Sequence, residues 1–353
     1  MKSTRNINAK YAAISILLLV LLTASCAHVS AIPANQDLPA SPTPDLHGLA
    51  PDAVLTLRSL EKVHDYPFYV MHYQGGYDYP KVGSTLPPRA DISCSLFASL
   101  GPGGDMYYGR NFDWELSPSL LLFTDPPDGY ASASMVDLEF LGIDPADARS
   151  LSDLPLADRE ALLAAPAMPF DGMNEYGLTI GMAAVPGEYL DDAAFDASLP
   201  RIGSIGIIRQ VLDHARDVNE AIDIFGQYNI DFSGGPPIHY LIADPGGKAA
   251  LVEFYQSKMV VLPNESPWHM ATNHLRCIAS GAGGCQRYRL LSDRLSASNG
   301  QLGSKGAMQL LSEVKQDMTQ WSAVYNMSKG DINIVVGQLY DKVYSFHLDS
   351  FQP

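Results

Sequence analysis

A strong turn between two short apolar runs constrains this chain more than any other feature. Residues 95–100 and 106–112 are rich in apolar and aromatic side chains, and Gly101-Pro-Gly-Gly-Asp105 between them contains nearly every strong turn former. The pattern predicts two β-strands joined by a tight loop. Such a hairpin fixes which residues face each other.

The register of this hairpin brings a thiol next to two charged groups. If the loop is centred on Gly103, residues pair when their numbers sum to about 206, which places Cys94 opposite Phe112 and beside Arg110 and Asp113. A thiolate is a nucleophile and a thiol is not, and a fixed positive charge lowers a thiol pKa from its reference near ~8.5. Arg110 can supply that charge. A buried structural cysteine beside a surface ion pair is the alternative that the hairpin alone leaves open.

This stretch resembles the cysteine N-terminal nucleophile (Ntn) hydrolases of the choloylglycine hydrolase, penicillin V acylase and acid ceramidase type. In that family a cysteine begins the mature chain, and a Gly-Arg-Asn-hydrophobic-Asp sequence closes the first hairpin. Residues 109–113 have this sequence here, with Arg110 16 residues and Asp113 19 residues after Cys94. The resemblance implies a four-layer αββα sandwich with two antiparallel sheets over about residues 94–353.

The order of the other predicted elements indicates an α+β fold. Strands, then helices, then more strands are typical of layered antiparallel sheets. A helix over residues 55–63 and a strand over 66–73 are expected before Cys94. After it, the pattern predicts helices over 204–214, 217–225, 286–297 and 306–317, and strands over 239–243, 249–255, 321–327, 332–337 and 343–348.

The first residues have the order of an export signal. Three basic residues precede an apolar run over residues 11–22 and a small-residue region. The run is too short for a membrane span of ~20 residues, so membrane contact is expected only through the signal or a lipid. Leu22-Thr-Ala-Ser-Cys26 resembles a bacterial lipoprotein processing site, which puts a lipid on Cys26, and cleavage after Ala31 is the alternative. The chain is therefore expected to be exported, as a periplasmic or cell-surface lipoprotein or in a secreted form.

Four segments follow from these features. They are a signal or lipoprotein signal peptide (1–31), a proline-rich linker (32–53), a propeptide or small subunit (54–93) and the catalytic domain (94–353). The resemblance implies that the Cys94 thiol itself cuts the Ser93–Cys94 bond and frees an α-amino group, whose pKa near ~8 suits a base. Residues 54–93 are expected to stay docked after the cut, because their helix and strand expose apolar area when released.

Later residues match other parts of the family's site. The resemblance implies that Asn273 stabilises the oxyanion, that Arg287 is a second arginine near the nucleophile, and that Asp113 orients the new amine. From residue types alone, Asn273 could cap a strand end, Arg289 competes with Arg287, and either arginine could be a helix-surface charge.

Three further positions border the predicted site as substrate contacts. Asn174 lies in a hairpin turn that matches the family and is expected first as a turn residue. Asn326 resembles a residue of the family's late strand. The bile-salt branch has another oxyanion Asn shortly after the turn, but residues 181–186 have no amide side chain, so a backbone N–H at Ala183 or Ala184 is the expected substitute.

Cys277 and Cys285 flank a glycine-rich loop. An exported chain meets oxidising conditions, so a disulfide is predicted between them, with a stabilising effect of roughly 2–3 kcal/mol. A zinc site completed by nearby histidines is the alternative. With that disulfide formed and Cys26 in the signal, Cys94 is the remaining free thiol.

Charge and motifs narrow the partners. The 23 basic and 39 acidic residues give a net charge of −16, which argues against a nucleic-acid partner. The sequence has no nucleotide-binding or metal-binding motif, so we expect neither a cofactor nor a metal. The expected partner is a small N-acyl amide substrate, and the sequence leaves open whether copies of the chain form a homo-oligomer.

The leading hypothesis is an exported, autoproteolytically activated amidase. It hydrolyses a linear C–N bond of an N-acyl compound through a thioester on Cys94. An acyltransferase, which passes the acyl group to an amine instead of water, is one alternative. An inactive surface-tethered binding module of the same fold is another, because the amide side chain near Ala184 is missing.

Overall fold

The computed structural model describes residues 48–77, 93–115, 117–143, 148–187, 196–233, 235–278 and 284–351. All of them belong to one unit, residues 45–353. The predicted signal peptide, with Cys26, and most of the predicted linker lie outside the described residues. Within the described ranges, every helix falls short of the length and apolar character that crossing a bilayer requires.

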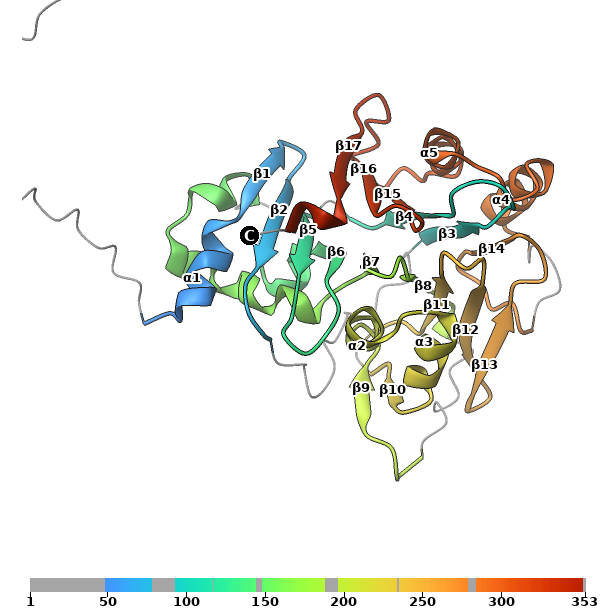
Figure 1. The fold of residues 1–353 in the computed structure, drawn as a ribbon, viewed down its shortest axis with the longest axis horizontal. Helices are drawn as coiled ribbons and strands as arrows, with labels where there is room; N and C mark the ends of the chain where they lie inside the picture. Colours follow the sequence, from blue (N-terminus) through green and yellow to red (C-terminus); the bar gives the residue numbers. More distant parts are fainter. Residues whose placement is uncertain are drawn as a thin grey trace, which may run out of the picture. The chain divides into compact units, whose positions relative to one another are not determined.

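The larger of the two main sheets has nine strands in the order β1-β2-β5-β6-β7-β8-β11-β12-β13 (Figure 1). Neighbouring strands are antiparallel, except that β2 and β5 run parallel. The strands are β1 (Glu61–His64), β2 (Phe68–Tyr73), β5 (Ser119–Thr124), β6 (Ser132–Asp137), β7 (Asp171–Asn174), β8 (Thr179–Ala184), β11 (Ile238–Ala243), β12 (Ala249–Tyr255) and β13 (Lys258–Pro263).

The smaller main sheet has six antiparallel strands in the order β14-β3-β4-β15-β16-β17. Its strands are β14 (Trp268–Ala271), β3 (Ser93–Ser99), β4 (Tyr107–Asp113), β15 (Thr319–Asn326), β16 (Asp331–Val336) and β17 (Tyr344–His347). A short parallel pair, β9 (Arg201–Gly203) and β10 (Asn229–Asp231), lies apart from both main sheets in the strand pairing.

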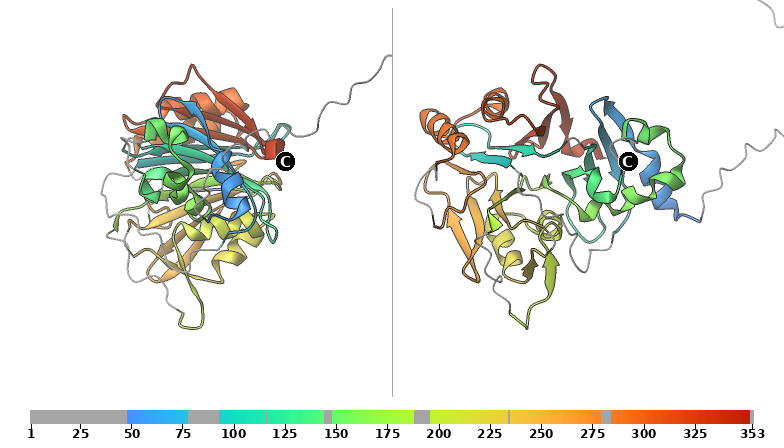
Figure 2. Two further views of the ribbon diagram at one scale, coloured as in Figure 1. Left: turned by 90° about the vertical axis from the view of Figure 1, so that its left-hand side faces the viewer. Right: turned by 180° about the vertical axis from the view of Figure 1, so that it is seen from behind.

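Helices cover the outer faces of both sheets. Helices α2 (Gly206–His214) and α3 (Val218–Phe225) contact β7, β8, β11 and β12, whereas α4 (Gln286–Ala297) and α5 (Ser304–Glu313) contact β3, β4, β14 and β15. Figure 2 shows these two helix pairs on opposite sides of the stacked sheets. The layers are therefore helix, sheet, sheet and helix, and the predicted αββα arrangement is confirmed.

Residue alternation along β3 divides the apolar side chains between two cores. Leu96 and Ala98 belong to the core that includes the facing surfaces of the two sheets, and Phe97 belongs to the core under α4 and α5. Tyr325 and Val324 on β15 divide in the same way. Successive strand residues point to opposite faces, so a strand covered on both sides carries buried side chains on both faces.

The elements before Cys94 differ from the prediction. The expected helix over 55–63 is a shorter helix, α1 (Pro51–Arg58), followed by strand β1, so the helix begins inside the predicted linker. Ser59 ends the helix because its N–H bonds the carbonyl groups of Leu55 and Thr56, and its hydroxyl accepts the N–H of His72 on β2. In contrast, α4 has the predicted bounds of 286–297.

Candidate active site

The hairpin formed by β3 and β4 has the predicted register. Cys94 pairs with Phe112, and Ser93 pairs with Asp113. Gly103 in the turn has a φ of +87°, which glycine adopts without the steric cost of a Cβ. Cys94 is completely buried and belongs to the core between the sheets.

The Arg110 guanidinium lies beside the Cys94 thiol. Its Nη2 is 3.8 Å from Sγ, and its Nη1 donates to the Met182 carbonyl at 2.9 Å. Its Nε is 2.8 Å from Asp171 Oδ2, and both of these side chains are fully buried. The Phe112 ring lies 4.8 Å from Cζ. These contacts hold a buried positive charge at the sulfur, because a buried guanidinium is stable only when it is paired and hydrogen-bonded.

Asp171 is a site residue that the sequence reasoning missed. Besides the ion pair with Arg110, its carboxylate accepts hydrogen bonds from Tyr325 Oη at 2.5 Å and Trp321 Nε1 at 3.2 Å. A buried arginine needs a buried acid as its partner, and this need could have directed the sequence reasoning to Asp171. Asp171 does not contact the thiol, so its role is to position Arg110.

Asp113 lies at the end of β4 next to the bond that is predicted to be cut. Thr319 Oγ1 donates to its Oδ1 at 2.5 Å, while Oδ2 is buried without a hydrogen-bond partner among the described residues. Burial raises the pKa of this carboxyl to about 6, although Thr319 and the charges of Arg287 and Arg110 act in the opposite direction. The free oxygen can accept a further hydrogen bond.

The thiol of the uncut chain is held in its neutral form. Burial raises the pKa of Cys94, and the charge of Asp113 acts in the same direction, whereas Arg110 and Arg287 lower it. Only the thiolate is a strong nucleophile. The proton must therefore leave the sulfur as the sulfur attacks.

Asn273, in the loop after β14, contacts the nucleophile directly. Its Oδ1 accepts the backbone N–H of Cys94 at 2.7 Å and Nη2 of Arg287 at 2.9 Å. Its Nδ2 donates to the Ala184 carbonyl at 2.8 Å. The structure therefore brings the predicted Asn273, Arg287 and Ala184 to Cys94.

Arg287, not Arg289, is the second arginine of the site. It is the second residue of α4, and its Nη1 donates to the Cys94 carbonyl and, at 2.9 Å, to the hydroxyl of Ser95. Arg289 donates instead to the Gly284 carbonyl at 3.1 Å. The sequence left open which of the two arginines belongs to the site. The structure points Arg287 toward Cys94 and Arg289 toward Gly284 from the first turn of α4.

The backbone of Ala184 faces the site. The N–H of Val185 bonds the Pro237 carbonyl at 2.9 Å. Because successive strand residues direct their N–H and C=O groups to alternate edges, both groups of Ala184 point to the other edge, where its carbonyl meets Asn273. Strand β7 pairs with β8 only as far as Gly181, so β7 does not pair with Ala184.

Asn174 is occupied by contacts of its own turn. Its Nδ2 donates to the carbonyl groups of Leu212 and Ala215 at 3.0 and 2.7 Å. Its Oδ1 accepts the N–H groups of Tyr176 and Leu178 at 3.1 and 3.2 Å. These bonds give it the turn role that was expected first, and the structure does not bring its amide to Cys94.

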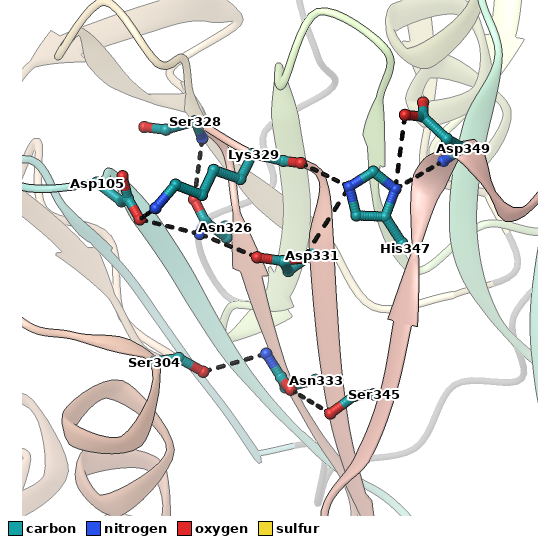
Figure 3. Close-up of polar contacts among 10 residues, drawn as sticks. All are labelled: Asp105, Ser304, Asn326, Ser328, Lys329, Asp331, Asn333, Ser345, His347 and Asp349. Carbon is teal, nitrogen blue, oxygen red and sulfur yellow. Dashed lines mark hydrogen bonds and ion pairs between the residues drawn. The ribbon is translucent and has the colours of Figure 1, made fainter. Parts of the chain in front are cut away.

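Asn326 lies at the far end of β15 from the nucleophile. It pairs with Tyr107, five residues along β4 from Phe112, which at a rise of about 3.3 Å per residue is about 17 Å. Figure 3 shows its amide between the carboxylates of Asp105 and Asp331, with both contacts at 3.3 Å. The predicted substrate contact at Asn326 is therefore not supported.

Cys277 and Cys285 are both free thiols in the structure, contrary to the predicted disulfide. The Cys277 N–H donates to Glu253 Oε2 at 2.8 Å, and burial together with this carboxylate raises the pKa of its thiol to about 12. The Cys285 sulfur lies 3.5 Å from Thr272 Oγ1. Each thiol thus has a different polar neighbour, and residues 279–283 between them lie outside the described residues.

The four layers define the class of this protein by its fold, which is the Ntn-hydrolase fold. The chain belongs to the family described as acyl-coenzyme A:6-aminopenicillanic acid acyl-transferase, whose model matches residues 165–342, half of the sequence. The matched part contains Asp171, Asn273 and Arg287 and begins after Cys94. The comparison with curated protein sequences gives no match.

Solved structures support the fold. A mutant of conjugated bile acid hydrolase from Clostridium perfringens has a TM-score of 0.53 and 17% sequence identity, over 73% of this chain and 93% of that chain. Penicillin V acylase from Agrobacterium tumefaciens has a TM-score of 0.48 and 16% sequence identity, over 72% of this chain and 86% of that chain. The Caenorhabditis elegans ortholog of N-acylethanolamine-hydrolyzing acid amidase has a TM-score of 0.44 and 14% sequence identity, over 67% of this chain and 93% of that chain. The first of these likenesses shows the shared fold.

Proposed function

We propose that this chain is an exported enzyme that cuts itself between Ser93 and Cys94 and then hydrolyses a linear N-acyl amide through a Cys94 thioester. The observation that carries the proposal is the convergence of Arg110, Asn273 and Arg287 on Cys94. A nucleophile surrounded by fixed donors suits acyl transfer. This arrangement favours an enzyme over an inactive binding module.

Self-cleavage uses groups that are in place in the uncut chain. Cys94 Sγ attacks the Ser93 carbonyl carbon, the thiol proton passes to the departing nitrogen of Cys94, and a thioester replaces the peptide bond. Water then opens the thioester and leaves a Ser93 carboxyl group with a free thiol and amine on Cys94. Asn273 Oδ1 already accepts a hydrogen bond from that nitrogen, so the new amine stays beside the sulfur.

The new amine is the base of the second reaction. An α-amino group has a pKa near ~8 and can take the thiol proton at neutral pH. Asn273 Oδ1 accepts one of its hydrogens, and the free Oδ2 of Asp113 is the acceptor for another. With two hydrogens held in this way, the lone pair of the nitrogen is directed to the sulfur.

Amide hydrolysis then follows in two steps. Sγ attacks the substrate carbonyl carbon while its proton passes to the Cys94 amine, and the C–N bond breaks as the substrate amine leaves with that proton. Water, deprotonated by the same Cys94 amine, then releases the acid from the thioester. The oxyanion is bound by the second hydrogen of Asn273 Nδ2, beyond the one given to Ala184, and by the Ala184 N–H.

Acyl transfer to an amine is the second candidate function. The family match supports it, because the family's description names an acyl-transferase, whereas the similar solved structure from Clostridium perfringens is named a hydrolase. Both reactions share the Cys94 thioester. They differ only in whether water or an amine attacks it.

The segment before Cys94 is proposed to remain bound after the cut. Strand β2 pairs with β5 over its whole length, from Phe68 opposite Ser119 to Tyr73 opposite Thr124. Its residues Phe68, Tyr69 and Met71 are fully buried. Export and a lipid on Cys26 are proposals that rest on the sequence of residues 1–47.

Intact mass and N-terminal sequencing of the purified protein, beside its Cys94→Ala variant, test the first step. The expected result is a large fragment that starts at Cys94 in the wild type and an uncut chain in the variant. A wild-type chain that stays uncut, or a variant that is cut, overturns the self-cleavage.

Product analysis tests the second step. The cleaved enzyme is incubated with a panel of N-acyl amides, with and without an added amine. Release of free acid in both cases supports the hydrolase, and formation of a new amide supports the transferase. A cleaved protein whose Cys94 is never acylated by any of these amides contradicts both.

A further inference from the structure

A buried histidine–glutamate pair lies behind the loop that carries Asn273. His239 on β11 and Glu253 on β12 are fully buried, and Nδ1 is 2.9 Å from Oε1. The other ring nitrogen, Nε2, is 2.7 Å from the carbonyl oxygen of Thr272, the residue before Asn273. The proposed chemistry of Cys94 uses neither side chain, so their burial needs another reason.

Glu253 holds the same loop from its other end. The N–H of Arg276 donates to both carboxylate oxygens, at 2.8 and 3.0 Å, and the N–H of Cys277 donates to Oε2 at 2.8 Å. The loop is therefore tied down on both sides of Asn273. These bonds fix the backbone on both sides of Asn273 and so support the direction that its own contacts with Cys94, Arg287 and Ala184 give to its amide.

The pair also joins this loop to the strand that carries Ala184. His239 on β11 pairs with Ala183 on β8. The two proposed oxyanion donors are the Asn273 amide and the Ala184 N–H. The residue next to each of them in the chain, Thr272 or Ala183, is hydrogen-bonded to or paired with His239.

The hydrogen bonds of the ring require one extra proton. The carbonyl of Thr272 can only accept, so Nε2 carries a hydrogen. Nδ1 faces a carboxylate, so a hydrogen must lie between Nδ1 and Oε1 as well. Burial raises the pKa of Glu253, but the bonds from His239 and from the Arg276 and Cys277 N–H groups outweigh it and lower that pKa. The pair therefore holds two hydrogens, one on Nε2 and one between Nδ1 and Oε1.

We propose that the His239–Glu253 pair positions Asn273 against Cys94, through its hydrogen bonds to the backbone on both sides of Asn273. The role of the pair as a positioning device rests on the proposed function of Cys94.

Three other titratable groups face the pair. Burial lowers the pKa of His269 on β14, so its ring is neutral there, and the Arg276 guanidinium favours the ionised form of Glu253. Cys277 is held as a neutral thiol by the same carboxylate. Among these groups, only the proton between His239 and Glu253 is required by two hydrogen bonds at once.

Two substitutions at Glu253 separate its charge from its hydrogen bonds. In Glu253→Gln the NH₂ can donate to Nδ1 of a neutral ring, and the remaining oxygen can accept the N–H groups of Arg276 and Cys277, so only the contact from the Arg276 N–H to Oε1 is lost. We expect self-cleavage of Glu253→Gln near the wild-type rate. We expect Glu253→Ala to cleave about tenfold or more slowly at every pH, since it loses several buried hydrogen bonds.

A matched control comes from a second buried pair. Arg209 and Asp213 are fully buried with Nε and Oδ1 3.0 Å apart on α2, and Asp213→Asn removes a buried carboxylate without touching the loop. It should keep the wild-type cleavage rate. A Glu253→Ala protein with the wild-type rate, or a Glu253→Gln protein as slow as Glu253→Ala, overturns the proposal.

A second readout does not depend on self-cleavage. In the Cys94→Ala chain, the N–H of residue 94 is bonded to Asn273 Oδ1, so its hydrogen-exchange rate reports the position of Asn273. Glu253→Ala should raise this exchange about tenfold or more, and Glu253→Gln should leave it unchanged. If the wild type never cuts itself but these rates differ as expected, the proposed function fails and the positioning role stands. Equal rates in both variants overturn the positioning role.

Discussion

Arg110 and Asp171 depend on each other more than on any other contact of the site. Both side chains are fully buried and 2.8 Å apart, so each compensates a charge that burial otherwise makes costly. The guanidinium also has two carbonyl acceptors, but carbonyl groups do not neutralise its charge. The position of the positive charge at Cys94 therefore depends on an acid that never touches the sulfur.

Asp171→Asn should abolish efficient self-cleavage. The change leaves Arg110 as an uncompensated buried cation, which costs about 3–5 kcal/mol of stability and lets the guanidinium turn away from Sγ. Thermal unfolding and the rate of appearance of the fragment that starts at Cys94 measure the two effects. Asp137→Asn is the control, because burial already raises the pKa of Asp137 to about 7 and its neutral form costs little. Equal cleavage rates for Asp171→Asn and Asp137→Asn would contradict this role.

Asp113 should make the uncut chain less stable as the pH rises. Its pKa is raised by burial from 3.8 to about 6, so the native state binds the proton more tightly than the unfolded state. The contribution of Asp113 to stability is then fully present below pH 3.8 and is lost as the pH rises through 6, by about 3 kcal/mol. Urea unfolding of Cys94→Ala and of Cys94→Ala with Asp113→Asn, at pH 4 and pH 8, measures this. The advantage of the second protein should grow with pH, and a constant difference would rule out the titration of Asp113.

At the scale of the elements, the sequence determined the hairpin but not the elements that meet at it. The pairing of Cys94 with Phe112 followed from one turn, because a two-strand register is a local property. The pairing of β15 with β4 links distant segments, and nothing in the local pattern shows that Asn326 lies at the far end. Asp171 was missed for the same reason, since its partner Arg110 is on the other sheet.

The loop between Cys277 and Cys285 gives a prediction at this scale. Both thiols are free in the structure, so alkylation of the unfolded chain without a reductant should modify Cys94, Cys277 and Cys285. A chain that lacks residues 1–47 removes Cys26 from the count. Mass spectrometry should show three adducts in this chain and two in its Cys94→Ala variant. A single adduct, at Cys94, would instead establish the disulfide expected from the sequence.

At the scale of the whole molecule, the proposed cut divides the chain but not its largest sheet. Strands β1 and β2 come before Cys94 and are the first two strands of the nine-stranded order. Their removal turns β5 into an edge strand, with the unpaired N–H and C=O groups that favour aggregation. Residues 120–123 of β5 are all fully buried apolar residues, so exposing them at that edge would further favour aggregation.

The two fragments of the cleaved protein should therefore behave as one particle. We expect them to elute together in gel filtration and to separate only in denaturant, because the whole β2–β5 ladder and three buried side chains, Phe68, Tyr69 and Met71, hold them together. A chain prepared to begin at Cys94 should aggregate, whereas a chain that lacks only residues 1–47 should stay soluble and cut itself. A soluble, active chain that begins at Cys94 would show that β2 is dispensable, and would make residues 54–93 a propeptide rather than a subunit.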